Sequence, residues 1–219
     1  MTLPINKDTK VQEKEMSAAE LKKLLGVGNT DMWDKAVPIA KNGNKYDAYI
    51  ADDIQSPDYY NELCFVLENA KAGDTVYLHL NTNGGYIDSA FKIIASIKRS
   101  KAKVVARLTG TVASAGTIIS LSCDELEVED FTSFMVHNYS GGTAGKGHEI
   151  VDYINFSDKS LKETFASIYE GFLSKKELDE VIKGKDMWFT ANDVRQRWAS
   201  YAHPQKPKPR KSTKKVTKK

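Results

Sequence analysis

The chain has 219 residues, of which 41% are hydrophobic and 28% charged, a composition that predicts one soluble globular domain with a substantial core. No apolar run approaches the ~20 residues that a membrane-spanning helix needs, and residues 1–16 lack the apolar centre of a signal peptide. Cys64 and Cys123 fit neither a metal motif nor a disulfide framework. We therefore expect a cytoplasmic protein with no membrane partner and no bound metal.

The formal net charge of +3 is unevenly distributed along the chain. From His203 onward there are eight Lys or Arg residues and no acid, so the rest of the chain is acidic overall. Prolines lie among these cations, and we predict a flexible basic tail over residues 203–219. The tail is expected to act as a solvated tether. The alternative is a segment that binds nucleic acid through charge alone, since no aromatic residue lies between the cations.

Residues 1–45 are predicted to form an N-terminal extension to the regular domain. The first 16 residues are polar and charged, which is typical of a disordered segment. The capping-box pattern from Ser17 to Glu20 predicts a short helix near residues 17–25. Residues 37–40 (Val-Pro-Ile-Ala) are a candidate edge strand. The regular domain is expected to span residues 46–202.

Apolar residues in that domain alternate or recur at helical spacing, with Gly or Pro at many boundaries. The first predicted elements are a strand at 46–51, a helix that starts at Pro57, a strand at 75–80, a helix at 87–99 and a strand at 103–108. The later ones are a helix after Ser114, strands at 126–128 and 133–137, a glycine-rich loop at 140–147, helices at 148–173, 175–182 and 191–199, and a buried extended pair at 188–189. Strands that alternate with helices predict an α/β fold with a mainly parallel sheet.

Ser114 lies where the strand at 103–108 gives way to a helix, within the small-residue stretch 110–117. Small neighbours let the backbone approach a ligand, and the start of a helix leaves N–H groups that can bind a developing negative charge. These features suit a nucleophilic serine with part of an oxyanion hole beside it. A serine N-cap with small residues for tight packing also explains them, and this stretch by itself favours that structural explanation.

Ligands in a parallel sheet collect at the carboxyl ends of the strands. The strand at 75–80 leads into Asn83-Gly84-Gly85, and neighbouring parallel strands would place this loop beside Ser114. The N–H groups of Gly85 and Ala115 could then bind one oxygen. By itself, the pair of glycines is also explained by a tight turn.

A serine nucleophile needs a base, and the base needs an acid that orients it. His137 ends an apolar strand just before the glycine-rich loop, and Asp186 precedes the apolar pair at 188–189. Either residue could instead be structural: a hydrogen-bonded histidine and a turn aspartate. The other histidines have plainer explanations. His79 lies in a strand, His148 starts a helix, and His203 belongs to the tail.

Four segments of residues 46–200 resemble, in order and spacing, the proteolytic subunits of Clp proteases (ClpP), which are self-compartmentalised serine peptidases. Residues 78–85 (Leu-His-Leu-Asn-Thr-Asn-Gly-Gly) are similar to the family strand that ends in Asn-Ser-Pro-Gly-Gly. Residues 112–116 (Val-Ala-Ser-Ala-Gly) are similar to its nucleophile turn, Ala-Ala-Ser-Met-Gly. Residues 134–137 (Phe-Met-Val-His) match its Met-Ile-His segment, and residues 186–191 (Asp-Met-Trp-Phe-Thr-Ala) match its Asp-Arg-Phe-Met-Ser-Ala.

The resemblance implies a catalytic triad of Ser114, His137 and Asp186, with the N–H groups of Gly85 and Ala115 as the oxyanion hole. It implies a ClpP/crotonase-like spiral of repeated ββα units, in which the helix at 148–173 is the protruding handle helix. The expected activity is hydrolysis of peptides or unfolded proteins inside an oligomeric chamber of heptameric rings, which could pair into a tetradecamer. No cofactor is implied. ATP would enter only through a separate AAA+ unfoldase.

The sequence departs from the family pattern in several places. Asn83 stands where the family usually has Pro, Asn138-Tyr139 replaces Gln-Pro, and residues 198–201 (Trp-Ala-Ser-Tyr) replace Gly-Leu-Ile-Asp. Residues 1–45 do not resemble the family's axial loop, which puts the pairing with an unfoldase in doubt. A bacteriophage source would account for such a diverged chain.

Two other enzyme classes remain open at the level of sequence. A peptidase of the signal-peptide-peptidase type would keep Ser114 but use a lysine base, for which Lys159 on the long helix is a candidate. A crotonase-like enzyme would share the architecture and the oxyanion hole but act on acyl-CoA without needing Ser114. A non-enzymatic ClpP-like protein with a nucleic-acid-binding tail is the fourth possibility.

Overall fold

The computed structural model describes residues 36–201. The helix predicted near residues 17–25 and the basic tail at 203–219 lie outside the described residues. None of the described helices is both long enough and apolar enough to cross a membrane.

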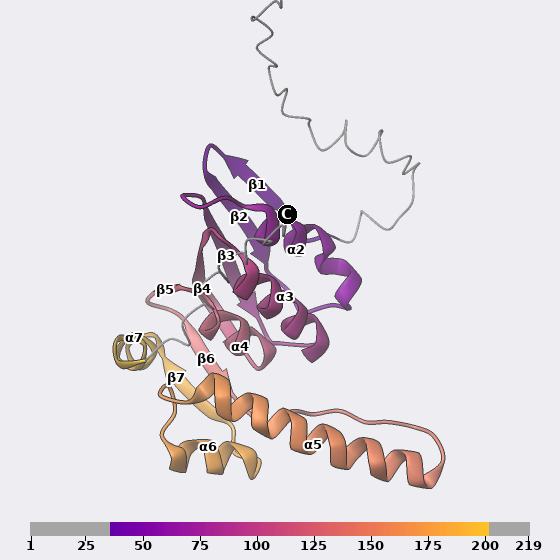
Figure 1. The fold of residues 1–219 in the computed structure, drawn as a ribbon. Helices are drawn as coiled ribbons and strands as arrows, with labels where there is room; N and C mark the ends of the chain where they lie inside the picture. Colours follow the sequence, from indigo (N-terminus) through magenta and orange to yellow (C-terminus); the bar gives the residue numbers. More distant parts are fainter. Residues whose placement is uncertain (1–35, 202–219) are drawn as a thin grey trace, which may run out of the picture. The chain divides into compact units, whose positions relative to one another are not determined.

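A single sheet of seven strands organises the domain (Figure 1). The strands are β1 (Ile39–Asn42), β2 (Lys45–Ile50), β3 (Thr75–Thr82), β4 (Lys103–Ala113), β5 (Glu125–Val128), β6 (Ser133–Val136) and β7 (Met187–Thr190). Their order is β1-β2-β3-β4-β6-β7, with β5 also paired to β4. The inner pairs are parallel and only the outermost strands, β1 and β7, pair antiparallel. The predicted α/β fold with a mainly parallel sheet is confirmed.

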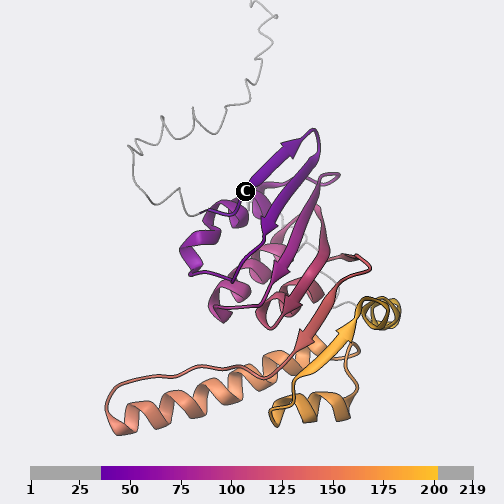
Figure 2. The same cartoon turned by 180° about the vertical axis from the view of Figure 1, so that it is seen from behind.

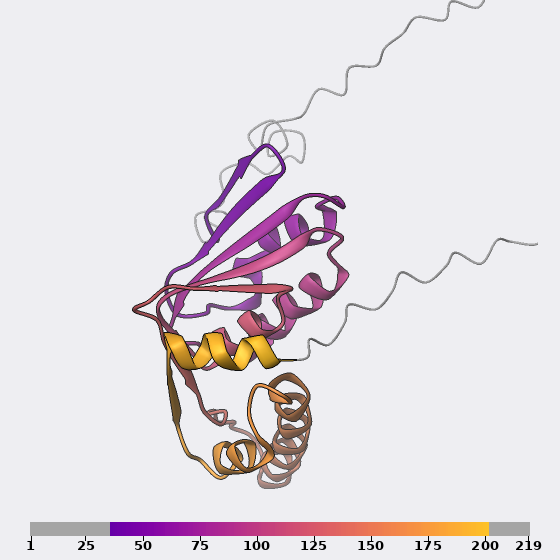
Figure 3. The ribbon, with the colours of Figure 1, turned by 90° about the vertical axis from the view of Figure 1, so that its left-hand side faces the viewer.

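Helices follow the strands in the predicted alternation. They are the 3₁₀ turn η1 (Pro57–Tyr60) and helices α2 (Asn61–Asn69), α3 (Ile87–Arg99), α4 (Ala115–Leu121), α5 (Gly147–Tyr169), α6 (Lys175–Ile182) and α7 (Ala191–Ser200). Helices α2, α3 and α4 cover one face of the sheet, as Figures 1 and 3 show. That face is apolar because the strand side chains alternate: Leu78 and Leu80 of β3 are fully buried, and Ile93 of α3 is buried with them.

Strand β4 is longer than predicted and continues to Ala113, directly before Ser114. Its first half pairs with β5 and its second half with β6. Between the halves Gly110 has a φ of 63°, and the register with β3 shifts there. Such a bulge bends a strand and increases its twist. The bend lets one strand run from the core of the sheet to the position of Ser114.

Helix α5 extends away from the sheet, and the chain between β6 and α5 runs back along it (Figures 1 and 2). The C-terminal end of α5 is anchored by the buried side chains of Phe165 and Tyr169. The helix ends at Tyr169 rather than at the predicted residue 173, because Gly171 has a φ of 87° and the chain turns there. Phe172 then returns into the core.

Two further predictions need correction. The candidate edge strand at 37–40 is present but lies at residues 39–42 as β1, which pairs with β2, so the sheet begins inside the segment predicted as an N-terminal extension. The expectation that both Trp188 and Phe189 are buried is wrong for Trp188, whose exposed fraction is 62%. Both lie in β7, where successive side chains point to opposite faces, so Met187 and Phe189 are buried and Trp188 is not.

An aromatic cluster holds β6 and β7 against the chain that follows α5. The ring of Phe172 lies 5.4 Å from that of Phe134 and 5.9 Å from that of Phe189, centroid to centroid. Tyr201 closes the cluster, 6.2 Å from Phe172. Aromatic pairs at these distances stabilise a core beyond their buried area. The cluster therefore fixes the two strands whose ends carry His137 and Asp186.

Candidate active site

Ser114 occupies the junction between β4 and α4 in a strained backbone conformation. Among residues 36–201 it is the one non-glycine residue with a positive φ, at φ 53° and ψ −123°. Such a conformation costs roughly 1–3 kcal/mol and persists only where the surroundings hold it. Its N–H donates to Met135 O over 2.9 Å, and its carbonyl oxygen accepts from the N–H of Thr117 over 2.9 Å. The turn therefore holds Ser114 half-buried at the carboxyl end of β4.

The structure brings His137 to this hydroxyl. Parallel pairing sets Ala113 of β4 opposite Met135 of β6, so Ser114 and His137 both lie at the carboxyl ends of these neighbouring strands. His137 Nε2 lies 2.7 Å from Ser114 Oγ, which is hydrogen-bond distance. The pair has the geometry that general-base activation of a serine requires.

Asp186 is brought to the other side of the imidazole by the β6–β7 register. Val136 pairs with Met187, so His137, which follows β6, and Asp186, which precedes β7, lie opposite each other. Asp186 Oδ1 lies 3.9 Å from His137 Nδ1, too far for a hydrogen bond, and 61% of the carboxylate side chain is exposed. The structure therefore places the three predicted residues in line, with the serine–histidine contact formed and the histidine–aspartate contact open.

Gly84 and Gly85 follow β3 and lie directly beside Ser114. Gly84 has a φ of 105°, and a Cβ added to it would lie 2.5 Å from Ser114 Cβ. Gly85 has a φ of 142° and forms an isolated parallel bridge with Ile54, against whose backbone a Cβ would collide. Glycine is required at both positions by conformation and by space.

The bridge with Ile54 determines where the N–H of Gly85 points. Ile54 N–H donates to Gly84 O over 2.6 Å, and Tyr86 N–H donates to Ile54 O over 2.9 Å. In a parallel bridge the flanking groups make these bonds, so the N–H of Gly85 itself points to the opposite side. Gly85 lines the cavity that contains Ser114.

Ala115 is the first residue of α4, and its N–H has no intrahelical acceptor because the first N–H groups of a helix never do. Ala115 and Gly85 line the same cavity as Ser114 and His137. Two backbone donors without a partner among the described residues thus adjoin the candidate nucleophile. Such a pair can bind an oxyanion.

The cavity has a volume of about 830 Å³ and is lined by the glycine loop and by residues of α5 from Tyr153 to Tyr169. Residues 85–87 and residues 139–143 are among the segments that line it. Its end toward α5 is apolar, with Ile118, Leu161 and Phe165 among the lining residues. The glycine-rich loop therefore borders the site rather than lying apart from it.

Lys159, the alternative base, is exposed on α5 and is not among the residues that line the cavity. His79 lies on the sheet, with its Nε2 2.7 Å from Asp47 Oδ1 and its ring stacked on Tyr49. His148 is exposed at the start of α5. Of the described histidines, only His137 lines the cavity.

Sequence reasoning missed three contributors to the site. Ile54 fixes the glycine loop, Thr117 holds the carbonyl of Ser114, and Tyr169 lies beneath Thr117 with its hydroxyl 2.6 Å away. Burial raises the pKa of the Tyr169 hydroxyl above its ordinary value, so this group stays protonated. No motif marks Ile54 or Tyr169, since each acts through contacts between segments distant in sequence.

A family model described as Clp protease matches residues 47–196. Among similar proteins, ATP-dependent Clp protease proteolytic subunit 2 of Pseudomonas aeruginosa is 33% identical over 82 residues, which cover 36% of this chain and 41% of that protein. Proteolytic subunit 3 of Rhizobium meliloti is 36% identical over 83 residues, or 37% of this chain and 43% of that protein.

A longer match, at lower identity, is to proteolytic subunit 1 of Chlamydia caviae, which is 25% identical over 133 residues. It covers 59% of this chain and 70% of that protein. The chain thus spans less than half the length of the first two relatives, while the family model covers most of the described domain. With its mainly parallel sheet, its protruding helix α5 and this match, the chain belongs to the Clp protease family.

Proposed function

We propose that this protein is a serine endopeptidase that hydrolyses peptide bonds by acyl transfer to water. The observation that carries the proposal is the 2.7 Å contact between Ser114 Oγ and His137 Nε2 at a strained strand–helix junction. The family supports the same reaction class, since the relatives are named as proteolytic subunits.

In the proposed mechanism His137 Nε2 takes the proton of Ser114 as Oγ bonds to the peptide carbonyl carbon. The carbonyl oxygen becomes an oxyanion that accepts hydrogen bonds from the N–H groups of Gly85 and Ala115. The C–N bond then breaks and the imidazolium gives its proton to the leaving amine. Water, deprotonated by the same imidazole, hydrolyses the acyl-enzyme.

Asp186 is the proposed orienting acid. At 3.9 Å its carboxylate is about an ångström beyond hydrogen-bond distance from His137 Nδ1. Catalytic hydrogen bonds are often long in unliganded enzymes and tighten when substrate binds. The exposure of Asp186 leaves its side chain room for this movement, after which it would hold the tautomer in which Nε2 is the base.

The substrate is proposed to bind as an extended strand between residues 85–87 and residues 139–143. Both segments line the cavity that contains Ser114. An added strand can pair with exposed backbone groups on both walls. A product bound elsewhere would contradict this arrangement.

Assembly into heptameric rings, the cytoplasm as location and action with a separate AAA+ ATPase are further proposals. They rest on family membership and on the names of the relatives, which are subunits of ATP-dependent proteases. The proposed chemistry itself uses no cofactor. Binding of nucleic acid by the tail at 203–219 remains a weaker proposal that rests on its charge.

The experiment compares hydrolysis of a fluorogenic short peptide and of casein by the wild type and by Ser114→Ala, His137→Ala and Lys159→Ala. We expect the first two variants to lose nearly all activity and Lys159→Ala to retain it. The wild type should also be labelled at Ser114 by a fluorophosphonate. Activity in Ser114→Ala would overturn the nucleophile, and loss of activity in Lys159→Ala alone would favour the Ser–Lys mechanism.

A further inference from the structure

The peptide between Ser114 and Ala115 has an unusual role, because both of its polar groups matter to the site. A trans peptide is planar, and its C=O and N–H point in opposite directions. Whatever fixes the carbonyl of Ser114 therefore also fixes the direction of the Ala115 N–H. In the proposed function that N–H is one of the two oxyanion donors.

The carbonyl of Ser114 is held by Thr117 through two hydrogen bonds. The backbone N–H of Thr117 donates to it over 2.9 Å, and the Thr117 hydroxyl over 2.6 Å. Any helix start can supply the first bond, from a backbone N–H. The second depends on the side chain and restrains rotation of the strained peptide in a way that the backbone alone does not.

The Thr117 hydroxyl is in turn held by Tyr169. Because a carbonyl oxygen only accepts, the single Thr117 proton must go to Ser114 O, so the Tyr169 hydroxyl must donate to Thr117 Oγ1 over its 2.6 Å contact. Tyr169 has 1% of its surface exposed and lies at the last turn of α5. A buried hydroxyl at this distance fixes the rotamer of Thr117.

We propose that Thr117 and Tyr169 are positioning residues that hold the Ser114–Ala115 peptide in its strained orientation and thereby aim the Ala115 N–H at the reaction's oxyanion. The chain of donors runs from Tyr169 Oη to Thr117 Oγ1 to Ser114 O and joins the base of α5 to the nucleophile. This inference rests on the proposed function. Neither residue touches the reacting atoms, and their effect passes through the backbone.

The first test replaces the Thr117 hydroxyl while its shape is kept. Thr117→Val is expected to lower kcat on a fluorogenic peptide about tenfold, less than the full loss of an oxyanion donor, with KM changed less than about twofold. Thr117→Ser keeps the hydroxyl and should restore kcat to within about threefold of the wild type. If the Thr117 hydroxyl only stabilised the fold, its loss would not lower kcat while leaving KM nearly unchanged.

Ser120→Ala is the matched control. Ser120 is also buried in α4, and its hydroxyl donates to Thr117 O rather than to the carbonyl of Ser114. This variant should match Thr117→Val in loss of thermal stability and keep the wild-type kcat. A fall in kcat of the same size in both variants would overturn the proposal, because general loosening of α4 would then explain it.

Tyr169→Phe provides the second test, since it removes only the hydroxyl that donates to Thr117 Oγ1. We expect a fall in kcat smaller than that of Thr117→Val, and the double variant should be no slower than Thr117→Val by itself. Additive losses would contradict a chain in which Tyr169 acts through Thr117.

The two proposals fail in different ways. An inactive wild type, or activity that survives Ser114→Ala, would remove the peptidase assignment. A wild type whose activity needs Ser114, combined with an unchanged kcat in a folded Thr117→Val protein, would leave the peptidase in place and remove the positioning roles. Native mass and thermal melting of each variant establish that it is folded and assembled like the wild type.

Discussion

At the scale of single residues, the site depends on backbone conformations that most side chains cannot adopt or leave room for. Ser114 has a positive φ, and the glycine loop lies against it so closely that a Cβ on Gly84 would overlap Ser114 Cβ. The strained turn and the glycines therefore form one unit. Strain of this kind accumulates where a reactive group must be presented outward.

Gly84→Ala is expected to lower kcat/KM by about 100-fold or more, because the added methyl must displace the nucleophile turn. Gly73→Ala is the matched control: Gly73 has a φ of 96°, close to the 105° of Gly84, but a Cβ there meets no atom within 4 Å. The control should lose about 1 kcal/mol of stability from backbone strain and keep wild-type activity. Steady-state kinetics and thermal melting measure both, and equal loss of activity in the two variants would point to strain alone.

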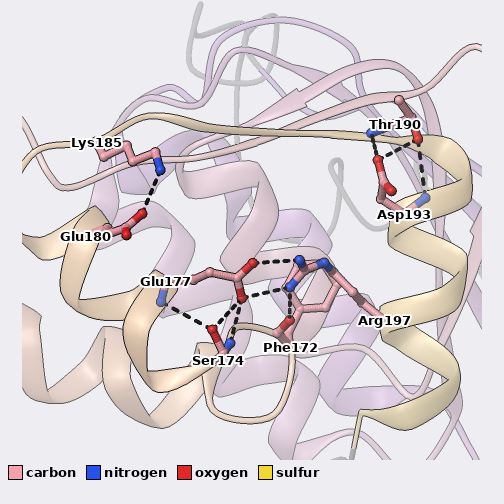
Figure 4. A network of polar contacts seen from close by, with 8 residues as sticks. All are labelled: Phe172, Ser174, Glu177, Glu180, Lys185, Thr190, Asp193 and Arg197. Atoms are coloured by element: carbon pink, nitrogen blue, oxygen red, sulfur yellow. Dashed lines mark hydrogen bonds and ion pairs between the residues drawn. The ribbon is translucent and has the colours of Figure 1, made fainter.

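At the scale of elements, an ion pair joins α6 to α7 behind the strand that follows Asp186. Arg197 of α7 donates to both carboxylate oxygens of Glu177, over 2.7 and 3.1 Å, and to Phe172 O over 2.9 Å (Figure 4). Glu177 also caps α6 by accepting from the N–H and hydroxyl of Ser174. The pair ties the end of α5, the start of α6 and α7 into one support for β7.

The stability of this support should depend on pH through Glu177. Hydrogen bonds from Arg197 lower the pKa of the Glu177 carboxyl from 4.5 to about 2. Since the folded pKa is below the unfolded value, the contribution is complete above about pH 4.5 and is lost as the pH falls toward 2. Partial exposure, 27% for the Glu177 side chain, reduces the expected size to about 1–2 kcal/mol.

Glu177→Gln should therefore lower the free energy of unfolding by about 1–2 kcal/mol at pH 7, and the difference from the wild type should vanish toward pH 2. Glu163→Gln is the control, because Glu163 is exposed on α5 and makes no ion pair with any residue in 36–201. Urea denaturation between pH 7 and pH 3 provides the measurement. A deficit for Glu177→Gln that stays constant across this range would show that the lost contact is not ionic.

At the scale of the whole molecule, the N-terminal half of α5 exposes several large apolar side chains. The group consists of Val151, Tyr153, Ile154 and Phe156. Tyr153 and Ile154 also line the cavity beside Ser114, whereas Val151 and Phe156 do not. Large exposed apolar side chains can mark an interaction site, and in the proposed rings we expect Phe156, which is 71% exposed, to pack against another copy of the chain.

Phe156→Glu is expected to shift the native particle to a smaller mass, because a charge would be buried at the contact between copies. Phe131→Glu is the matched control, since Phe131 is 92% exposed in the turn before β6, away from α5. Native mass spectrometry or light scattering gives the mass of each variant. An unchanged mass for Phe156→Glu, or the same fall in both variants, would remove the inferred role of α5.

The elements of this fold could largely be predicted because their signals are local. The helix at residues 87–99 and the strand start at Lys103 follow from periodicity and turn residues, and the strand–helix turn at Ser114 from its small residues. Errors arose where distant contacts decided the outcome. The prediction that Trp188 is buried is wrong because side chains alternate along β7 and that of Trp188 lies on the uncovered face, and the bounds of the predicted edge strand at 37–40 shifted to 39–42 through its pairing with β2.

The sequence alone determined the order of strands and helices, because periodicity and turn residues are properties of neighbours along the chain. The resemblance of four segments to a known family supplied the family and the three residues offered as a triad. The tertiary structure decided how those residues meet. The β4–β6 and β6–β7 registers set His137 against Ser114 and opposite Asp186, and register depends on side chains that pack across strands. The same packing buries Tyr169 beneath Thr117, a contact between residues 52 positions apart that no local pattern encodes.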